Sequence, residues 1–451
     1  MVCKLPFDMN FGIDICPAAT SHMPDQAAPA RPRLLLILSC AAILLFYLLY
    51  AASNLALIIR MHSAPPPQIL TATHELPQSD FAMFWYSGKL LLMNAVNAHG
   101  GDWAPNAWMQ RTFQANFTIP GKIFHLNWMY PPTMGLLAML YAAVPLALSF
   151  WVWRTIFLLA GAVLLRQAGL SWAIIVMGLV SPAEWHDMLG GQNGALTGSL
   201  LVASLFLIEA RPRLGGTFAG LLCIKPQIGL MMPMILLNRG RAPALLACVF
   251  CVGLCVLLTL PLEGWKSWTW FLSYSRHAPV NFVARPFAEA FPAAGITVFF
   301  MARSLHAGVT AAWVWQAASS TLAALAIWRI WRHPAANPAG RIALSMCLWV
   351  LLTPYGYLYD LVGFSIAMAA MFMQAPDQQK PLYGLLWLSA GYTGTLASLT
   401  GIIWMPAIAT LGAGAIWSLT RGAPCQTVMS GKLKPPADYT HPGSGPPPLH
   451  N

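Results

Sequence analysis

Apolar runs separated by short polar breaks dominate the chain. The first run, RPRLLLILSCAAILLFYLLYAASNLALII over residues 31–59, is too long for a signal-peptide core and has no clear cleavage site, so we expect a retained membrane helix. Further apolar segments follow, several of them shorter than the roughly 20 residues that cross a bilayer as a helix. They cover residues 133–148, 150–166, 170–182, 193–209, 214–237, 242–261, 290–304, 309–331, 342–372, 381–397 and 400–420. The pattern predicts an all-α polytopic membrane protein with about 11–13 transmembrane or re-entrant helices.

A long stretch that is rich in Trp, Phe and Tyr, residues 61–131, separates the first two membrane helices. Aromatic side chains of this kind favour the membrane–water interface. Within the stretch, Ser79 can cap a helix that begins at Asp80, and aromatic residues recur after it at helical spacing. We therefore expect an amphipathic helix that lies on the membrane surface in the first outer loop.

Two of the apolar segments are interrupted in the middle. The segment GLLCIKPQIGLMMPMILLNRGR contains Pro226 and Pro233 and has arginine pairs before and after it. If both pairs are cytoplasmic, this segment enters the membrane and returns, and its broken backbone must line a cavity enclosed by protein. Residues 342–372 are interrupted at LLTPYGYLYDL, so we expect two helices there.

The composition agrees with a chain that lies mostly in lipid. Only 9% of the 451 residues are charged, 57% are hydrophobic, and the mean hydropathy is +0.60. Soluble domains carry about 25% charged residues, so this chain cannot cover an ordinary water-exposed surface. Residues 1–30 and 421–451 are polar, Pro-rich and without periodicity, and we expect disordered tails around a membrane domain of residues 31–420.

Basic residues outnumber acidic ones, 25 to 14, but they occur as small clusters between apolar runs. Nucleic-acid binding requires a basic face in water, so we expect no nucleic-acid partner, and membrane lipids with anionic headgroups instead. Arg31 and Arg33 place the start of the first helix in the cytoplasm by the positive-inside rule. Residues 61–131 then face outward.

Among the few carboxylates, Asp80 is well placed for chemistry. At a helix start, the free N–H groups and the helix dipole favour an ionised carboxylate, which is what a general base needs. The alternative is a first-turn residue that only stabilises its helix. Glu184, His186 and Asp187 form a second polar group, but they are too close in sequence to share one helix face. We expect a hydrogen-bonded loop that supports a substrate there, rather than a metal site, and we predict no metal and no cofactor.

Candidate cations also interrupt the apolar pattern. Lys225 lies within an apolar segment, where it either snorkels as a structural lysine or binds a phosphate group. Arg276 and His277, in the predicted outer loop WTWFLSYSRHAPVNF, are similar candidates. Tyr359 and Asp360 lie at the second helix interruption, where ordinary core hydrogen bonding is the alternative to a role in the site.

Several motifs in this order resemble glycosyltransferase family 87. They are SDFAMFWYSGKLLL, MYPP at the start of the second helix, GGQNGAL, CIKPQIGLMMPMILLNRGR and TPYGYLYDL, and they extend over about residues 35–420. The resemblance implies a GT-C-type fold and a membrane transferase that uses polyprenyl-phosphate sugars, as mannosyltransferases of lipid glycan synthesis do. The aromatic GYLYD departs from the His-containing version of some members.

The resemblance implies roles for particular residues of this chain. Asp80 resembles the catalytic aspartate of the first outer loop, and Gln192, Asn193 and Lys225 match the GQ-N and K-P positions of the family motifs. The predicted site has Asp80 as the catalytic residue, while the donor phosphate and substrate-pocket residues are Lys225, Arg276, His277, Gln192, Asn193, Tyr130, Trp85, Tyr355, Tyr359 and Asp360.

The expected reaction is transfer of a hexose, mannose above others, from a polyprenyl-phosphate donor to a lipid or glycan acceptor at the outer face of the plasma (inner) membrane. A lipid-linked sugar phosphate has a good leaving group, so one base suffices and the anomeric carbon is inverted. A hydrolase normally has two paired carboxylates. A transporter or flippase is an alternative, although the sequence has no clear inverted repeat. A non-catalytic subunit of envelope glycan assembly is another, and it would tolerate loss of Asp80.

Overall fold

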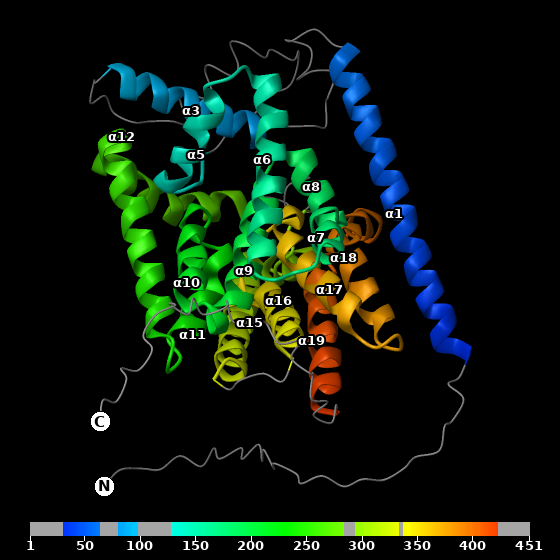
Figure 1. The fold of residues 1–451 in the computed structure, drawn as a ribbon. Helices are drawn as coiled ribbons and strands as arrows, with labels where there is room; N and C mark the ends of the chain where they lie inside the picture. The colour runs from blue at the N-terminus through cyan, green and yellow to red at the C-terminus, as the bar shows by residue number, and fades with distance from the viewer. Residues whose placement is uncertain (1–29, 64–79, 98–127, 284–293, 333–336, 423–451) are drawn as a thin grey trace, which may run out of the picture.

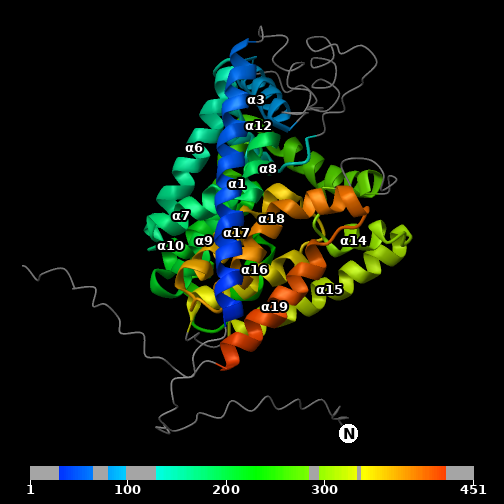
Figure 2. The same cartoon turned by 90° about the vertical axis from the view of Figure 1, so that its right-hand side faces the viewer.

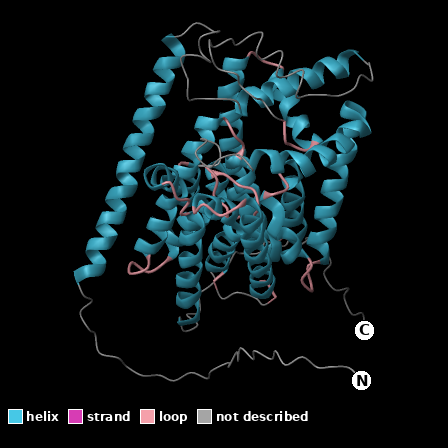
Figure 3. Cartoon of the chain, turned by 180° about the vertical axis from the view of Figure 1, so that it is seen from behind, coloured by secondary structure: helices cyan, strands magenta, loops and turns pink. Residues whose placement is uncertain are grey.

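Helices make up the part of the chain that the computed structural model describes, namely residues 30–63, 80–97, 128–283, 294–332 and 337–422 (Figure 1). These ranges contain sixteen α-helices and three short 3-10 segments, and the only β pairing within them is one isolated bridge between Gly295 and Tyr357 (Figure 3). The prediction of an all-α protein is confirmed. The expected tails, apart from a few residues beside the membrane domain, and most of residues 61–131 lie outside the described ranges.

The helices and 3-10 segments of the described ranges have the following bounds. In chain order they are α1 (Ala30–Ser63), α3 (Asp80–Asn97), α5 (Pro132–Ala142), α6 (Leu146–Gln167), α7 (Trp172–Leu179), α8 (Pro182–Gly190), α9 (Gly194–Ala210), α10 (Pro212–Leu221), η1 (Leu222–Ile224), η2 (Ile228–Met231), α11 (Met232–Leu236), α12 (Ala242–Val283), α14 (Val298–Ser304), α15 (Val309–Ile330), α16 (Pro338–Leu352), η3 (Leu358–Leu361), α17 (Val362–Gln374), α18 (Lys380–Thr400) and α19 (Met405–Gly422).

Three helices of the described residues are long and apolar enough to cross a membrane, and they belong to α1, α6 and α12. Shorter apolar helices accompany them at Pro132–Ala142, Gly194–Ala210, Pro338–Leu352, Leu358–Gln374 and Met405–Thr420. Large apolar side chains are exposed on the long helices, for example Leu48 on α1, Leu159 on α6 and Phe250 on α12. Such surfaces are stable in lipid rather than in water, and the chain is a multi-pass membrane protein.

α3 lies across one end of the more upright helices (Figure 1). It packs on α5 so closely that a Cβ at Gly88 would collide with the backbone of Ala138. Small residues allow this kind of close helix contact in a membrane protein. The expected helix that begins at Asp80 is present, and it runs crosswise to the more upright helices (Figure 1).

The interrupted segment from α10 to α11 enters the bundle and returns to the end where α10 begins. Helical structure breaks into η1, η2 and α11 around Lys225 and Pro226, as the sequence predicts. The return is fixed by an ion pair, because Arg241 Nη2 lies 3.1 Å from Glu209 Oε1, just before α10. Several side chains at the break are buried, among them Ile224, Lys225 and Ile228, whereas Pro226 is exposed.

The second interruption separates α16 from α17. Carbonyl groups at the end of α16 lose their helical partners there, and side chains of α15 replace them. Ser319 donates a 3.0 Å hydrogen bond to the Leu351 carbonyl, and Ser320 donates a 2.7 Å bond to the Leu352 carbonyl. This satisfies the backbone where η3 approaches the site.

Two expectations from the sequence are wrong in detail. The segment predicted as an outer loop around Arg276 and His277 is helical, because α12 continues past a kink at Gly264, which has φ 71° and ψ 171°. The apolar run ends at Pro261, but helical backbone does not require apolar residues. The segment around Glu184, predicted as a loop, forms α8, whose N-terminus is capped by the Ser181 hydroxyl.

α1 runs along one side of the bundle, at the right in Figure 1 and in front of the other helices in Figure 2. Its main packing partner is α18, and the Phe46 ring meets the Trp387 ring edge-on at 5.3 Å. One turn further along α1, Tyr50 reaches α8, where its hydroxyl donates a 2.6 Å hydrogen bond to Glu184 Oε2. The first helix is thus tied to the rest of the protein by a few aromatic side chains.

Candidate functional site

A tight turn between α8 and α9 forms the centre of the site. Its sequence is GGQNG, and Gly191 has the left-handed backbone with φ 60° that ends α8. A Cβ at Gly191 would press on Phe81 of α3, and a Cβ at Gly194 would collide with the Tyr359 carbonyl of η3. Glycine is therefore required at both positions. The turn holds Gln192 and Asn193 between α3 and η3.

Asp80 is joined to this turn by a short chain of hydrogen bonds. Gln192 Nε2 donates a 2.5 Å bond to Asp80 Oδ2, and the Tyr130 hydroxyl donates a 2.8 Å bond to Gln192 Oε1. Trp153 Nε1 donates to the Gln192 carbonyl at 3.3 Å and so fixes the backbone as well. Asp80 itself is half-buried, whereas Gln192 is buried. A donor directed at the carboxylate stabilises its ionised form.

Lys225 forms the second part of the site. Its ammonium lies 2.6 Å from Asp360 Oδ1 and donates a 3.0 Å hydrogen bond to Asn193 Oδ1. Both side chains of the ion pair are buried, with exposures of 2% and 0%. The ammonium also lies over the rings of Tyr359 and Tyr130, at 4.7 Å and 5.8 Å from their centroids. A lysine so far from water is stable only because its charge is balanced and hydrogen-bonded.

Tyr130 links the two parts. Its hydroxyl bonds Gln192, and its ring faces the Lys225 ammonium. Burial raises the pKa of the Tyr130 hydroxyl well above its usual value, and the negative charges of Asp80 and Asp360 raise it further. Tyr130 therefore stays protonated and remains a hydrogen-bond donor.

Three tyrosines of the second interruption pack beside the ion pair. The Tyr355 and Tyr357 ring centroids are 5.2 Å apart, and those of Tyr357 and Tyr359 are 5.6 Å apart. The backbone N–H of Tyr357 donates a 3.0 Å bond to Asp360 Oδ2, which fixes the carboxylate that holds Lys225. Tyr355 and Tyr359 are half-buried and contribute aromatic surface to the site.

The polar residues of α8 point in different directions. Asp187 accepts hydrogen bonds from the backbone N–H groups of Gly194 and Ala195, at 2.5 Å and 3.0 Å, and so stabilises the start of α9. His186 Nε2 lies 3.2 Å from the Gly391 carbonyl of α18, and Glu184 bonds Tyr50. In the described ranges no group of three or more His, Cys, Asp and Glu could hold a metal ion. Burial raises the pKa of Asp187 to about 6, although its two backbone donors oppose the shift.

Arg154 on α6 is a polar residue of this region that the sequence reasoning did not identify. Its Nη2 donates a 2.8 Å hydrogen bond to the Tyr50 hydroxyl, and its Nε lies 3.8 Å from Glu184 Oε1. Glu184 belongs to α8, outside the candidate spans, and burial raises the pKa of its carboxyl to about 8, against the opposing effects of Arg154 and Tyr50. The sequence does mark this residue, because Arg154 interrupts the apolar run SFWVWRTIFLL in the same way as Lys225 interrupts the apolar segment around it.

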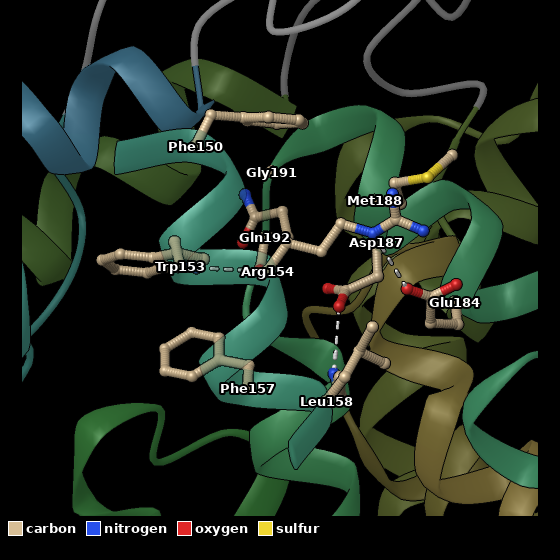
Figure 4. Close-up of a pocket in the computed structure, with 11 residues that line it drawn as sticks. Phe150, Trp153, Arg154, Phe157, Leu158, Glu184, Asp187, Met188, Gly191 and Gln192 are labelled. Atoms are coloured by element: carbon tan, nitrogen blue, oxygen red, sulfur yellow. Dashed lines mark hydrogen bonds and ion pairs between the residues drawn. The ribbon is translucent and has the colours of Figure 1, made fainter. Parts of the chain in front are cut away.

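A small pocket lies between α6 and α8, next to the turn (Figure 4). Its lining residues are Phe150, Trp153, Arg154, Phe157, Leu158, Glu184, Asp187, Met188, Gly191, Gln192 and Ala195. Figure 4 shows Arg154 extending from α6 toward the carboxylates of α8. As it stands, the pocket has room for about one water molecule.

The contacts bring together most of the residues that the sequence singled out, but not all. Asp80, Gln192 and Tyr130 form one hydrogen-bonded chain, and Asn193, Lys225, Asp360, Tyr355 and Tyr359 cluster beside it. Trp85 lies further along α3, where its Nε1 donates a 2.8 Å bond to the Val144 carbonyl. The backbone places Arg276 and His277 in the second half of α12, and their side chains lie outside what the structure describes.

The fold and this site define a helical membrane protein with a buried ion pair and a half-buried aspartate at one end of its bundle. The model of glycosyltransferase family 87 matches residues 128–354, half of the chain. The chain belongs to glycosyltransferase family 87 and is therefore a transferase that uses a sugar donor and an acceptor. The matched segment contains Gln192, Asn193 and Lys225, whereas Asp80 and Asp360 lie outside it. Searches of curated proteins and of solved structures found no match.

Proposed function

We propose that this glycosyltransferase moves a hexose, mannose in the first instance, from a polyprenyl-phosphate donor to a lipid or glycan acceptor at the outer face of the plasma (inner) membrane. The observation that carries the proposal is the position of Asp80. Its carboxylate begins the crosswise helix α3 and accepts a 2.5 Å hydrogen bond from Gln192. A half-buried carboxylate beside an enclosed polar cluster suits a general base.

The reaction requires one base and a charge-stabilised leaving group. The acceptor hydroxyl gives its proton to the Asp80 carboxylate while its oxygen forms a bond to the anomeric carbon from the face opposite the phosphate. The bond between that carbon and the phosphate oxygen breaks, and its electron pair leaves with polyprenyl phosphate, which gains a negative charge. The configuration at the anomeric carbon is inverted.

The departing phosphate calls for cations, and Lys225, Arg276 and His277 are the candidates predicted from the sequence. Gln192 and Asn193 are proposed as neutral hydrogen-bond donors to the phosphate. The rings of Tyr130, Tyr355 and Tyr359 supply apolar faces on which a sugar ring can pack. The Lys225 charge is already balanced by Asp360 at 2.6 Å. A dianionic product therefore needs at least one further cation, because an uncompensated charge next to lipid is costly.

The orientation follows from the arginines at residues 31 and 33, at the start of the first helix. With that end in the cytoplasm, Asp80 faces the periplasm or the outside. A cysteine in place of Ser79, in an otherwise cysteine-free variant, is expected to react with an impermeant thiol reagent in intact cells. Labelling only after lysis would reverse the orientation.

A transfer assay tests the proposal directly. Purified protein in lipid discs is incubated with a polyprenyl-phosphate hexose labelled in the sugar and with candidate acceptors extracted from envelope lipids. We expect release of polyprenyl phosphate that depends on acceptor and on Asp80. A transporter or a non-catalytic subunit would release none, and release that persists in Asp80→Asn would remove Asp80 as the base.

A further inference from the structure

Asp187 is a buried carboxylate that lies behind the site rather than in it. It belongs to α8 and is 4% exposed. The proposed reaction gives it no step. A carboxylate so far from water needs hydrogen bonds that replace its lost hydration, and the partners that it has therefore indicate what it does.

Asp187 bonds three residues of the turn GGQNGA. Its backbone carbonyl accepts a 2.9 Å hydrogen bond from the N–H of Gln192. One of its carboxylate oxygens accepts from the N–H of Gly194 at 2.5 Å, and the other accepts from the N–H of Ala195 at 3.0 Å. These bonds lie on both sides of Asn193. A single residue thus fixes the backbone that carries the side chains of Gln192 and Asn193.

The start of α9 depends on this carboxylate. The first N–H groups of a helix have no carbonyl partner within it, and the side chain of Asn193, at the N-cap position, makes no capping bond. A Cβ at Gly194 would meet Asp187 Oδ1 as well as the Tyr359 carbonyl. The carboxylate therefore fits closely into the turn, at a position where only glycine leaves room for it.

The two side chains on this turn reach the two parts of the site. Gln192 donates its hydrogen bond to Asp80, and Asn193 accepts one from the Lys225 ammonium at 3.0 Å. Both would move if the turn shifted, because Asp187 holds the backbone from which they extend. A misplacement of about 1 Å among reacting groups can cost about a hundredfold in rate.

We propose that Asp187 is a positioning residue for sugar transfer, whose ionised carboxylate holds the turn so that Gln192 orients Asp80 and Asn193 orients Lys225. This inference rests on the proposed function, because Asp187 acts through the proposed base. The competing interpretation is that Asp187 only stabilises the N-terminus of α9, as carboxylates near helix starts commonly do.

The proposal makes the turn sensitive to pH. A protonated carboxyl has an O–H that donates, so it cannot accept both N–H groups as the carboxylate does. Burial raises the pKa of Asp187 to about 6, the two backbone donors and Lys225 oppose the rise, and Asp360 adds to it. The other titratable or charged groups around it are Glu184 and His186 of α8, Tyr130 and Arg154. Turnover should therefore fall below about pH 6 in the wild type but not in Asp187→Asn, whose amide does not titrate there.

Amide hydrogen exchange tests the hydrogen bonds of Asp187 without substrate. The amides of Gly194 and Ala195 are followed in the full-length protein in lipid discs at neutral pH. We expect exchange at both amides to rise about tenfold or more in Asp187→Ala, which loses both acceptor oxygens. In Asp187→Asn, which keeps one acceptor oxygen, exchange should rise at one of the two amides.

A cryo-EM structure of Asp187→Asn tests the effect on the site, again without substrate. We expect the Gln192 amide to be displaced from Asp80. The matched control is Glu184→Gln, because Glu184 is also a buried carboxyl of α8 but bonds Tyr50 rather than the turn. This control should leave both the amide exchange and the contact between Gln192 and Asp80 unchanged.

Turnover per folded molecule separates positioning from stabilisation. It is measured with polyprenyl-phosphate mannose as the donor and an envelope lipid extract as the acceptor, over a range of pH on both sides of about 6. At neutral pH we expect a loss of about tenfold in Asp187→Asn, and only the wild type and Glu184→Gln should lose turnover in acid. If Asp187→Asn lowers the Tm but keeps wild-type turnover and its fall in acid, Asp187 only stabilises α9 and the proposal is overturned.

The outcomes also separate this inference from the proposed function. A wild type that releases no polyprenyl phosphate from this donor contradicts the donor class. The fate of Asp187 is then decided by the two measurements without substrate, and unchanged amide exchange with Gln192 still on Asp80 overturns its role. Should neither variant fold, exchange at Gly194 and Ala195 of the wild type must rise below about pH 6 relative to the Thr197 amide, which α9 itself bonds. A constant ratio would overturn the proposal.

Discussion

Asp80 and Asp360 are carboxylates of the same site in opposite electrostatic settings. Asp360 is buried, lies 2.6 Å from the Lys225 ammonium and accepts a hydrogen bond from the backbone N–H of Tyr357. Asp80 is half-buried and accepts a hydrogen bond from a neutral amide, that of Gln192. One carboxylate is fixed by a charge of opposite sign, while the other is oriented by a dipole at the edge of the cluster.

The difference separates two roles that a list of acidic residues cannot distinguish. A general base must accept a proton, and a carboxylate in a tight ion pair gives up that interaction when it does so. Asp360 is therefore suited to hold Lys225 and the backbone of η3 in place. Asp80 accepts a hydrogen bond from the neutral amide of Gln192 and is half-buried at the edge of the cluster, where an acceptor hydroxyl can reach it, and so it is the better candidate for the base.

The largest expected effect is that of Asp80→Asn. Asparagine has nearly the size of aspartate but cannot take the acceptor proton, and loss of a general base typically costs about 10² to 10⁴ in rate. We expect turnover per folded molecule to fall by that factor while donor affinity stays near the wild-type value. Asp377→Asn is the control, since Asp377 pairs with Lys380 on the surface. Reduced stability with nearly intact turnover would instead assign Asp80 to capping of α3.

The second effect concerns stability rather than chemistry. Asp360→Asn or Lys225→Gln leaves one buried charge without its partner, which costs about 3–5 kcal/mol in the free energy of unfolding. The double variant Lys225→Met/Asp360→Leu removes both charges and should recover much of that loss. Thermal unfolding in detergent measures all three. Single variants as stable as the wild type would show that this ion pair does not hold η3.

Part of this arrangement could be predicted from the sequence, and the physical reason is local. Lys225, Asp360 and Asp80 each stand out because a charge interrupts or borders an apolar run, and the interruptions of α10–α11 and α16–α17 follow from proline and glycine. The pairing of Lys225 with Asp360 could not be predicted, because the two residues are far apart in sequence and meet only through packing. The continuation of α12 beyond Gly264 was missed for another reason, because the apolar run ends at Pro261 while the helical backbone continues through polar residues.

Glu184 is a third carboxyl to compare with Asp360 and Asp80. Burial raises its pKa from 4.5 to about 8, despite Arg154 and Tyr50. The folded state then holds a proton that the unfolded state releases, so stability falls as pH rises above about 4.5 and levels off above about 8, by at most about 1.4 kcal/mol per pH unit. Glu184→Gln lacks this proton release. Its Tm should therefore rise relative to the wild type between pH 5 and pH 8, and parallel Tm curves would contradict a buried, protonated Glu184.

The smallest expected effect tests how Asp80 is oriented. Gln192→Leu removes the amide that donates to Asp80 and accepts from Tyr130 but leaves the base itself. A hydrogen bond to a charged group contributes about 1.5–3 kcal/mol, and water can replace part of it at a half-buried carboxylate. We expect turnover to fall about tenfold, much less than in Asp80→Asn, and the donor KM to rise because Gln192 is also proposed to bind the donor phosphate.

The control for that variant is Gln167→Leu, because Gln167 is an exposed glutamine at the end of α6. It should keep wild-type turnover and KM. If Gln192 is merely structural, Gln192→Leu should lower the Tm and the yield of folded protein without lowering turnover per folded molecule. If turnover of Gln192→Leu falls as far as that of Asp80→Asn, the Gln192 amide takes part in the reacting geometry together with the Asp80 carboxylate. The contrast between Asp360 and Asp80 would then have to include Gln192.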